Sequence, residues 1–227
     1  MKLSVVVPVY NEAATVREII ERVKRVAIPK EIILVDDGST DGSRDIILEL
    51  SSDSIRTAFH NKRRGKGAAI QTGLKYVTGD VILIQDADLE YNPEDYHNLI
   101  APILSGKADI VFGSRFRNPG VRKLYNLYHY LGNKTLNFFT NVLFGCMLSD
   151  LEGGYKMIKR EVMEEIRLRS NGFEIEAEMV AKILKRRYRI YECPISYESR
   201  TYEEGKKIRW RDGFLALYTL LKYRLMD

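Results

Sequence analysis

The first half of the chain alternates short β-branched apolar runs with amphipathic segments, and this alternation constrains the fold more than any other feature. Residues 3–9 form a continuous apolar run, and residues 12–26 follow with apolar side chains at helical spacing. The pair repeats at 31–35 and 41–50. Apolar strands joined by amphipathic helices predict an α/β fold with a mostly parallel central sheet and helices on both faces.

The rest of the chain continues this pattern and then departs from it. Further strands are predicted at 55–59, 81–85 and 109–112, and helices at 67–77 and from Asn92-Pro93 onward. The aromatic-rich stretch 121–148 predicts two helices joined by a turn. After it we expect a strand within 154–158, a helix at 175–187, a strand at 190–197 and a final helix at 212–225.

Composition limits the class of protein. The 227 residues, 45% hydrophobic and 30% charged, suit one folded domain. Two cysteines without C-x-x-C spacing favour a reducing compartment and argue against a zinc site. The apolar stretch 213–221 is far short of the ~20 residues that a bilayer span needs, so we expect no transmembrane span. The apolar run at the N-terminus is interpreted as a buried strand rather than a signal peptide.

Positive charge is concentrated in the last part of the chain. From Lys182 onward there are 12 Lys/Arg and 6 Asp/Glu, against a net charge of +5 for the whole. This asymmetry indicates an anionic partner such as phosphate, anionic lipid or nucleic acid, with a merely solvated basic face as the alternative.

Acidic residues follow three of the predicted strands. Glu12 comes after the first strand, Asp36-Asp37 after the second, and Asp86, Asp88 and Glu90 after the fourth. Ligands of parallel sheets bind outside the carboxyl ends of the strands, so these carboxylates should share one crevice. Their mutual repulsion predicts a bound cation.

The D-x-D pair Asp86 and Asp88 suits Mg²⁺ or Mn²⁺, which carboxylates hold together with a diphosphate. The alternative is that both residues only cap the following turn.

Basic groups near the same edge suit phosphate. Residues 61–67, N-K-R-R-G-K-G, lead into a helix whose N-terminal amides favour an anion, although the P-loop spacing is lacking. Arg115 and Arg117 follow the fifth strand, and their guanidinium forks suit phosphate oxygens. Asp150 lies next to glycines that could bring it close to a substrate. A solvated turn and an inert surface acid are the alternatives.

The last segment mixes cations with aromatic residues. Lys206 and Lys207 precede a helix containing Trp210, Phe214 and Tyr218. This composition suits a helix lying in a membrane interface, while packing of its apolar stripe on the domain is the competing interpretation.

Taken together, these segments resemble glycosyltransferase family 2, in particular the dolichyl- and polyprenyl-phosphate hexosyltransferases typified by dolichyl-phosphate mannosyltransferase. The likeness spans nearly the whole chain in the expected order. The motifs are V-P-V-Y-N-E at 7–12, V-D-D-G-S-T-D at 35–41, R-G-K-G at 64–67, Q-D-A-D-L at 85–89, G-S-R at 113–115 and P-I-S-Y-x-x-R at 194–200.

The resemblance implies a GT-A fold, a nucleotide-sugar donor, an inverting reaction and a divalent metal. The residues expected to bind the nucleotide sugar are Pro8, Tyr10, Glu12, Val35, Asp37, Lys66, Gly67, Asp86, Ala87 and Asp88. Asp86, Asp88 and Glu90 would hold Mg²⁺ or Mn²⁺, and Asp88, Asp150 and Arg115 would be catalytic. The acceptor phosphate would meet Arg115, Arg117, Arg200, Lys206 and Lys207.

Some positions depart from the family pattern. Glu90 stands where Gln is frequent, Lys206-Lys207 replaces a Ser-Lys, and the C-terminal membrane spans of many members are missing. Within one domain we expect a nucleotide-sugar half at 1–118, an acceptor-side half at 119–211 and a terminal amphipathic helix at 212–227.

The expected function is transfer of mannose or glucose from a GDP- or UDP-sugar to a polyprenyl or dolichyl phosphate. It would take place at the cytoplasmic membrane face, through peripheral contact, in a possible homo-oligomer. Three alternatives stay open: a family 2 transferase acting on a sugar hydroxyl, a sugar-1-phosphate nucleotidyltransferase, and a non-catalytic nucleic-acid-binding module. The last leaves the carboxylate crevice unexplained, so no nucleic-acid partner is expected.

Overall fold

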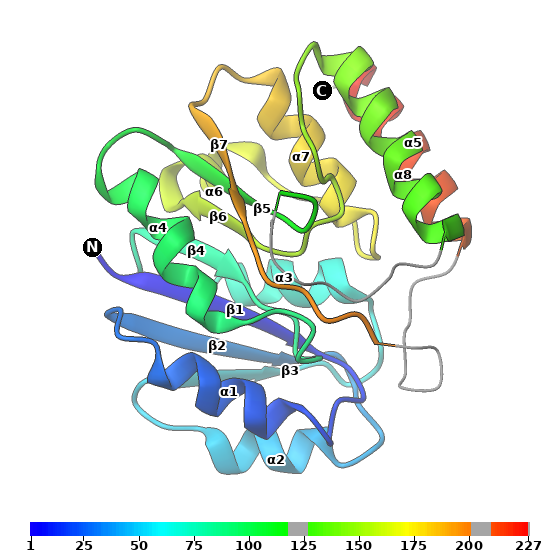
Figure 1. The fold of residues 1–227 in the computed structure, drawn as a ribbon. Helices are drawn as coiled ribbons and strands as arrows, with labels where there is room; N and C mark the ends of the chain where they lie inside the picture. Colours follow the sequence, from blue (N-terminus) through cyan, green and yellow to red (C-terminus); the bar gives the residue numbers. More distant parts are fainter. Residues whose placement is uncertain (118–126, 201–209, 227) are drawn as a thin grey trace.

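The computed structural model describes residues 1–117, 127–200 and 210–226 and has a central seven-stranded sheet (Figure 1). The strand order is β3-β2-β1-β4-β6-β5-β7. The strands are β1 Leu3–Val9, β2 Lys30–Asp36, β3 Ile55–Phe59, β4 Val81–Ile84, β5 Ile110–Ser114, β6 Lys156–Lys159 and β7 Ile190–Pro194. All except β6 run parallel to one another, so the predicted mostly parallel sheet is confirmed.

Helices cover both faces of the sheet because β-strand side chains alternate between the faces. On one face Val5 and Val7 pack with the apolar residues of α1 Val16–Arg25, α2 Ser43–Leu50 and α4 Tyr96–Leu104. On the other face Val6 packs with α3 Lys66–Leu74, α6 Arg160–Ile166 and α7 Ile175–Lys185. Two cores result, and the sheet holds its carboxyl edge rigidly between them.

Strand β6 and helix α6 differ from the sequence interpretation. The strand expected within 154–158 begins at Lys156 and lies antiparallel between β4 and β5. Helix α6 begins directly after it and was not predicted, since it has only seven residues. The first helix begins at Val16 rather than at residue 12, because residues 10–15 form the turn that carries Glu12.

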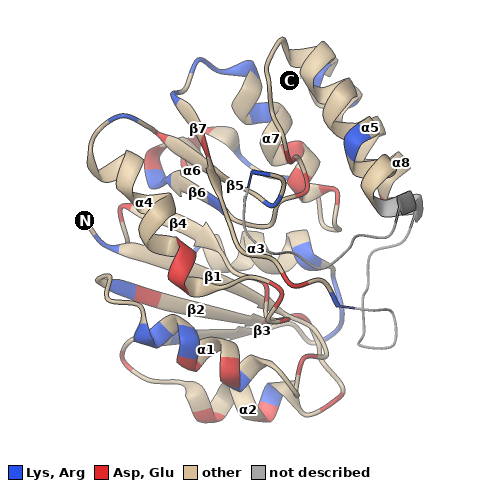
Figure 2. Ribbon diagram, viewed as in Figure 1, with Lys and Arg blue, Asp and Glu red and all other residues tan. Residues whose placement is uncertain are grey.

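The prediction of two helices within 121–148 was wrong for the described part. Residues 127–144 form one helix, α5 Leu127–Phe144, and Gly145 ends it with a positive φ. Residues 118–126 lie outside the described structure. Figure 2 shows that α5 carries basic but no acidic residues, whereas α1 and α2 carry both signs.

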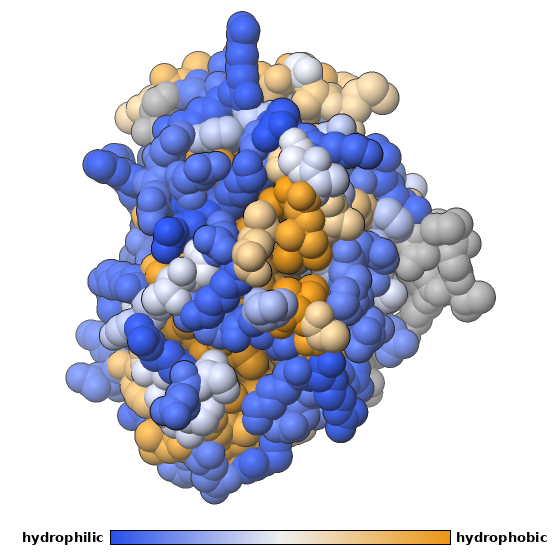
Figure 3. Space-filling model, turned by 90° about the vertical axis from the view of Figure 1, so that its left-hand side faces the viewer, coloured by the Kyte–Doolittle hydropathy of each residue, from blue (hydrophilic) through white to orange (hydrophobic). Residues whose placement is uncertain are grey.

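Helix α8 Trp210–Met226 packs against α7 and α5 at one edge of the molecule (Figure 1). Ala216, Leu220 and Tyr223 are buried in the core beneath it. In the part of the chain that the structure describes, no helix is long and apolar enough to cross a membrane. The opposite side of the molecule is mostly hydrophilic, with an apolar strip near its centre (Figure 3).

If α8 is an integral part of the fold, its buried side chains must contribute to stability. Leu220→Ala should lower the free energy of unfolding by about 2–5 kcal/mol, because it leaves a cavity under α8. Leu225→Ala, on the exposed side of the same helix, should change it by less than about 0.5 kcal/mol. Urea denaturation measures both, and equal losses would contradict the packing.

Candidate active site

The predicted carboxylate crevice forms where β1, β2 and β4 end. One residue from the far end of the chain, Arg200, joins three of its carboxylates. Arg200 pairs with both oxygens of Glu12 at 3.0 and 3.1 Å, and its Nη2 lies 3.3 Å from Asp88 Oδ2. The backbone N–H of Arg200 donates to Glu90 Oε1 at 2.7 Å. Glu12, Asp88 and Glu90 are therefore neighbours, as the strand-end argument predicts.

Asp88 is the carboxyl group whose pKa responds to this crowding. Burial, reinforced by the charges of Asp86 and Glu90, raises its pKa to about 7, against the opposing effect of Arg200. The next residue, Leu89, has a φ of 64°, a left-handed conformation that is costly for a branched residue. The tight turn at Leu89 keeps the acids of residues 86–90, the D-A-D-L-E segment, close together.

Asp86 belongs to a buried chain of alternating charges. Lys66 Nζ lies 2.8 Å from Asp86 Oδ1 and 3.1 Å from Glu176 Oε1, and Glu176 in turn pairs with Lys156 at 2.7 Å. Burial alone would raise the pKa of Glu176, but Lys156 and Lys66 outweigh it and hold the pKa at about 2. Lys66 was predicted from the sequence, whereas Glu176 and Lys156 were missed because neither follows a motif.

The carboxylates of the D-A-D-L-E segment are hard oxygen donors and fit Mg²⁺ or Mn²⁺ in chemical type. Within the described residues no three His, Cys, Asp or Glu side chains are grouped as ligands of one ion. Here Lys66 and Arg200 balance Asp86 and Asp88, and Glu90 also accepts from the Tyr197 hydroxyl at 3.0 Å. Asp86 and Asp88 fit a divalent cation in donor type, whereas the predicted set of three that includes Glu90 is not found as a group in the described residues.

Asp37 binds the backbone of residues 61–67, which we call the basic loop, rather than pointing freely into the crevice. Its two oxygens accept from the amides of Arg64 and Gly65 at 2.9 and 2.7 Å, and His60 Nδ1 lies 2.7 Å away. His60, which follows β3, was missed by the sequence reasoning. Its position after a strand end was the signal that could have found it.

The glycines of the basic loop are required by close backbone contacts with the segment before α7. A side chain at Gly67 would come within 2.3 Å of the Ser170 carbonyl, and one at Gly65 equally close to that of Asn171. The Ala68 amide donates to the Asn171 carbonyl at 3.1 Å. The start of α3 thus packs against the segment before α7, so the phosphate site expected there stays a prediction.

The other residues expected at the nucleotide sugar divide into two groups. Val35 and Ala87 bury their side chains in the two cores, so only their backbones can face a ligand. Pro8 is partly exposed near the end of β1, and the Tyr10 ring lies under the Arg63 guanidinium at 4.4 Å.

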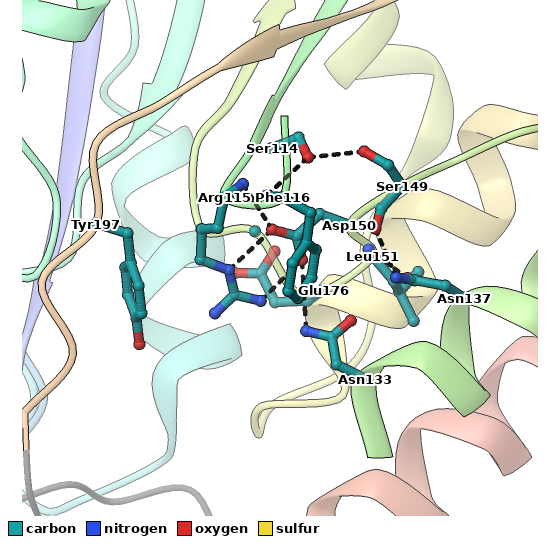
Figure 4. Close-up of polar contacts among 12 residues, drawn as sticks. Ser114, Arg115, Phe116, Asn133, Asn137, Ser149, Asp150, Leu151, Glu176 and Tyr197 are labelled. Carbon is teal, nitrogen blue, oxygen red and sulfur yellow. Dashed lines mark hydrogen bonds and ion pairs between the residues drawn. The ribbon is translucent and has the colours of Figure 1, made fainter. Parts of the chain in front are cut away.

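Arg115 and Asp150 form a tightly joined pair beside the crevice (Figure 4). Arg115 Nε and Nη2 each donate to one oxygen of Asp150 at 2.8 Å, and the Arg115 amide donates to Oδ2 at 2.9 Å. Burial would raise the pKa of Asp150, but Arg115 outweighs it and lowers that pKa. Asp150 is therefore an ionised side chain that fixes the guanidinium, which also lies against the Tyr197 ring at 5.0 Å.

Asparagines of α5 hold the segment that carries Asp150 (Figure 4). Asn137 donates to the Ser149 carbonyl at 2.6 Å and accepts from the Leu151 amide at 2.8 Å. One turn further along, Asn141 bonds both the amide and the carbonyl of Leu148. This spacing by four along one helix is the signal in the sequence that could have predicted the contact.

The remaining cations expected at the acceptor are less closely joined to the site. Arg117 pairs with Glu192 at 2.9 Å and is half exposed. Arg200 lies with Glu12 and Asp88, as described above, so its contact with an acceptor phosphate stays a prediction. Lys206 and Lys207 lie outside the described residues.

An α/β sheet with an acidic cluster and a basic loop at its carboxyl edge is the architecture of GT-A glycosyltransferases. Residues 4–167 match the model of glycosyl transferase family 2. The chain belongs to this family and is a glycosyltransferase.

Two named relatives are similar over most of the chain. This chain is 31% identical to a dolichol-phosphate mannosyltransferase of Pyrococcus furiosus, over 91% of this chain's length. It is 32% identical to the low-salt glycan biosynthesis hexosyltransferase Agl6 of Haloferax volcanii over 88% of its length. The chain spans 59% and 49% of these two proteins, respectively.

Among solved structures, glucosyl-3-phosphoglycerate synthase of Mycobacterium tuberculosis has the same fold. Its complex with Mn²⁺, UDP and phosphoglyceric acid superimposes with a TM-score of 0.76 at 20% identity. The match covers 100% of this chain and 79% of the synthase.

Proposed function

We propose that the protein transfers a hexose from a GDP- or UDP-sugar to a polyprenyl or dolichyl phosphate, with inversion at the anomeric carbon. The observation that carries the proposal is the state of Asp150. Both its oxygens are held by Arg115 and its pKa is lowered, so it is a poor proton acceptor. A phosphate monoester has its second pKa near ~6 and is already ionised at neutral pH, so it needs no base.

In this proposal the donor diphosphate lies at the D-A-D-L-E segment. Asp86 and Asp88, with Glu90 next to them, would hold Mg²⁺ or Mn²⁺. Such a bound ion would offset the charge of the leaving diphosphate. The bound Mn²⁺ and UDP of the mycobacterial synthase support this assignment by likeness of fold. Lys66, anchored by Glu176, would supply a fixed positive charge beside the diphosphate.

The acceptor phosphate would meet the guanidinium of Arg115. Asp150 aligns that guanidinium, and Tyr197 lies against its face. Arg117, Lys206 and Lys207 would add positive charge on the same side. The relatives named for dolichol phosphate and for hexosyl transfer support a lipid phosphate as acceptor. Transfer would then take place at the cytoplasmic membrane face, where such an acceptor is embedded.

A second candidate acceptor is a sugar hydroxyl, and Glu152 is the observation that favours it. Burial, aided by the charges of Asp150 and Glu176, raises the pKa of Glu152 despite Arg115 and Lys156. A carboxyl group with a raised pKa beside the acceptor arginine is a suitable general base for a hydroxyl.

Replacing the central D-x-D acid tests the reaction. Asp88→Ala should lower hexose transfer by about a hundredfold or more with either metal, since metal assistance is worth several kcal/mol. Transfer from labelled GDP-mannose and UDP-glucose to a short polyprenyl phosphate measures it. The exposed Asp53→Ala is the matched control and should retain full activity. Undiminished turnover of Asp88→Ala would refute the assignment.

The raised pKa of Asp88 predicts a pH dependence for metal binding. Below about 7 this carboxyl group is protonated, so Mn²⁺ must displace a proton, and affinity should fall about tenfold for each pH unit. Above about 7 the effect should level off. Calorimetry in two buffers of different ionisation enthalpy should find about one proton released at pH ~6 and almost none at pH ~8. A constant proton count would contradict the prediction.

Glu152 separates the two acceptors. If the acceptor is a phosphate, Glu152→Gln should lower kcat by less than about fivefold. If it is a hydroxyl, removal of the base should cost about 10²- to 10⁴-fold. The same transfer assay decides, with kcat measured at saturating donor and acceptor.

A further inference from the structure

Helix α5 exposes a stripe of large apolar side chains, although several of its polar side chains are buried. Phe138 and Val142 are 63% and 66% exposed, and Leu131 shares their stripe at 51%. Asn137 and Thr140, by contrast, are buried against the domain and hydrogen-bonded. This pattern is the reverse of a surface helix in water, where the apolar stripe faces the core. The outer side of α5 therefore suits apolar surroundings.

Helix α8 lies beside α5 and adds a second exposed apolar stripe (Figure 1). Phe214, Tyr218, Leu221 and Leu225 follow one another at helical spacing, and Phe214 is 68% exposed. Of the 17 large apolar side chains exposed within the described residues, 12 lie on α5, on α8 or at Met147 just after α5. We call this surface the α5–α8 face. Its apolar patch is concentrated enough to indicate a binding surface.

The charge around the α5–α8 face indicates what covers it. Residues 110–149 contain no Asp or Glu. Lys134 on α5, and Lys222 and Arg224 on α8, are exposed cations on the two helices. A second copy of the face would bring like charges together, whereas an anionic lipid surface would attract them. Exposed Phe, Tyr and Leu combined with Lys and Arg match a helix lying in the headgroup region.

We propose that the α5–α8 face docks on an anionic lipid bilayer, with its apolar side chains in the interfacial region. The proposal extends the function above, whose acceptor is a lipid phosphate, by assigning the membrane-contacting surface. The inner side of α5 bonds the backbone on both sides of Asp150, which in turn holds Arg115. Docking would therefore place the headgroups on the outer side of the helix whose inner side positions Arg115.

Vesicle binding by the purified chain tests this surface without donor or acceptor, so the outcome does not depend on transfer activity. The chain should sediment with vesicles of phosphatidylcholine and phosphatidylglycerol, and less with phosphatidylcholine alone. The triple variant Phe138→Gln, Val142→Gln, Phe214→Gln should bind at least about tenfold more weakly. The matched control, Leu48→Gln with Leu104→Gln, changes equally exposed apolar residues elsewhere and should bind as the wild type does.

Circular dichroism and the melting temperature show whether each variant is folded. A folded triple variant that binds vesicles like the wild type would overturn the proposal. So would a wild-type chain that ignores anionic vesicles and forms a dimer that the triple variant abolishes, since a second copy would then cover the face. Binding by the wild type in both lipids equally would refute the role of the cations.

Discussion

The structure depends on balancing the carboxylates that the sheet collects at its edge. Parallel strands that end together place Glu12, Asp86 and Asp88 within one crevice, and burial strengthens their repulsion. The balancing cations come from distant parts of the chain. Lys66 lies at the start of α3, and Arg200 comes 188 residues after Glu12. The acidic edge thus fixes where the later part of the chain must lie, and it keeps positively charged groups next to the place where a diphosphate would bind.

The charges around Arg115 are arranged differently from those of the acidic crevice. There a single acid pairs with a single cation, because both oxygens of Asp150 accept hydrogen bonds from Arg115. A carboxylate with a lowered pKa is a good orienting group and a poor base. The pair therefore suits an acceptor that is already an anion. Burial raises the pKa of Glu152, so Glu152 is the side chain that we propose as the base if the acceptor is a hydroxyl.

The sequence predicts the sheet, its carboxyl edge and the acids on it, since these depend on local periodicity and on strand ends. It does not predict the partners of those acids. Glu176 on α7 meets Lys66 at the start of α3 and Lys156 on β6, all three from distant parts of the chain. His60 meets Asp37 only through the pairing of neighbouring strands. Within 121–148 the aromatic pattern suggested two helices joined by a turn, whereas the described residues 127–144 form one helix. The outward apolar side chains obscure the usual period. Contacts between distant segments have no local signature.

The exposed apolar stripe of α5 explains why its apolar spacing did not predict a single helix. Asn137 and Asn141 of α5 face the domain, and their side-chain amides bond the backbone of the segment that carries Asp150. Hydrogen bonds to a backbone segment fix position more specifically than apolar contacts do, since they need particular partners and angles. The asparagines of the inner face thus position Arg115 through Asp150, while Leu131, Phe138 and Val142 lie on the outside. Precise placement of Arg115 and an apolar surface on the far side of α5 are two consequences of the same residue pattern.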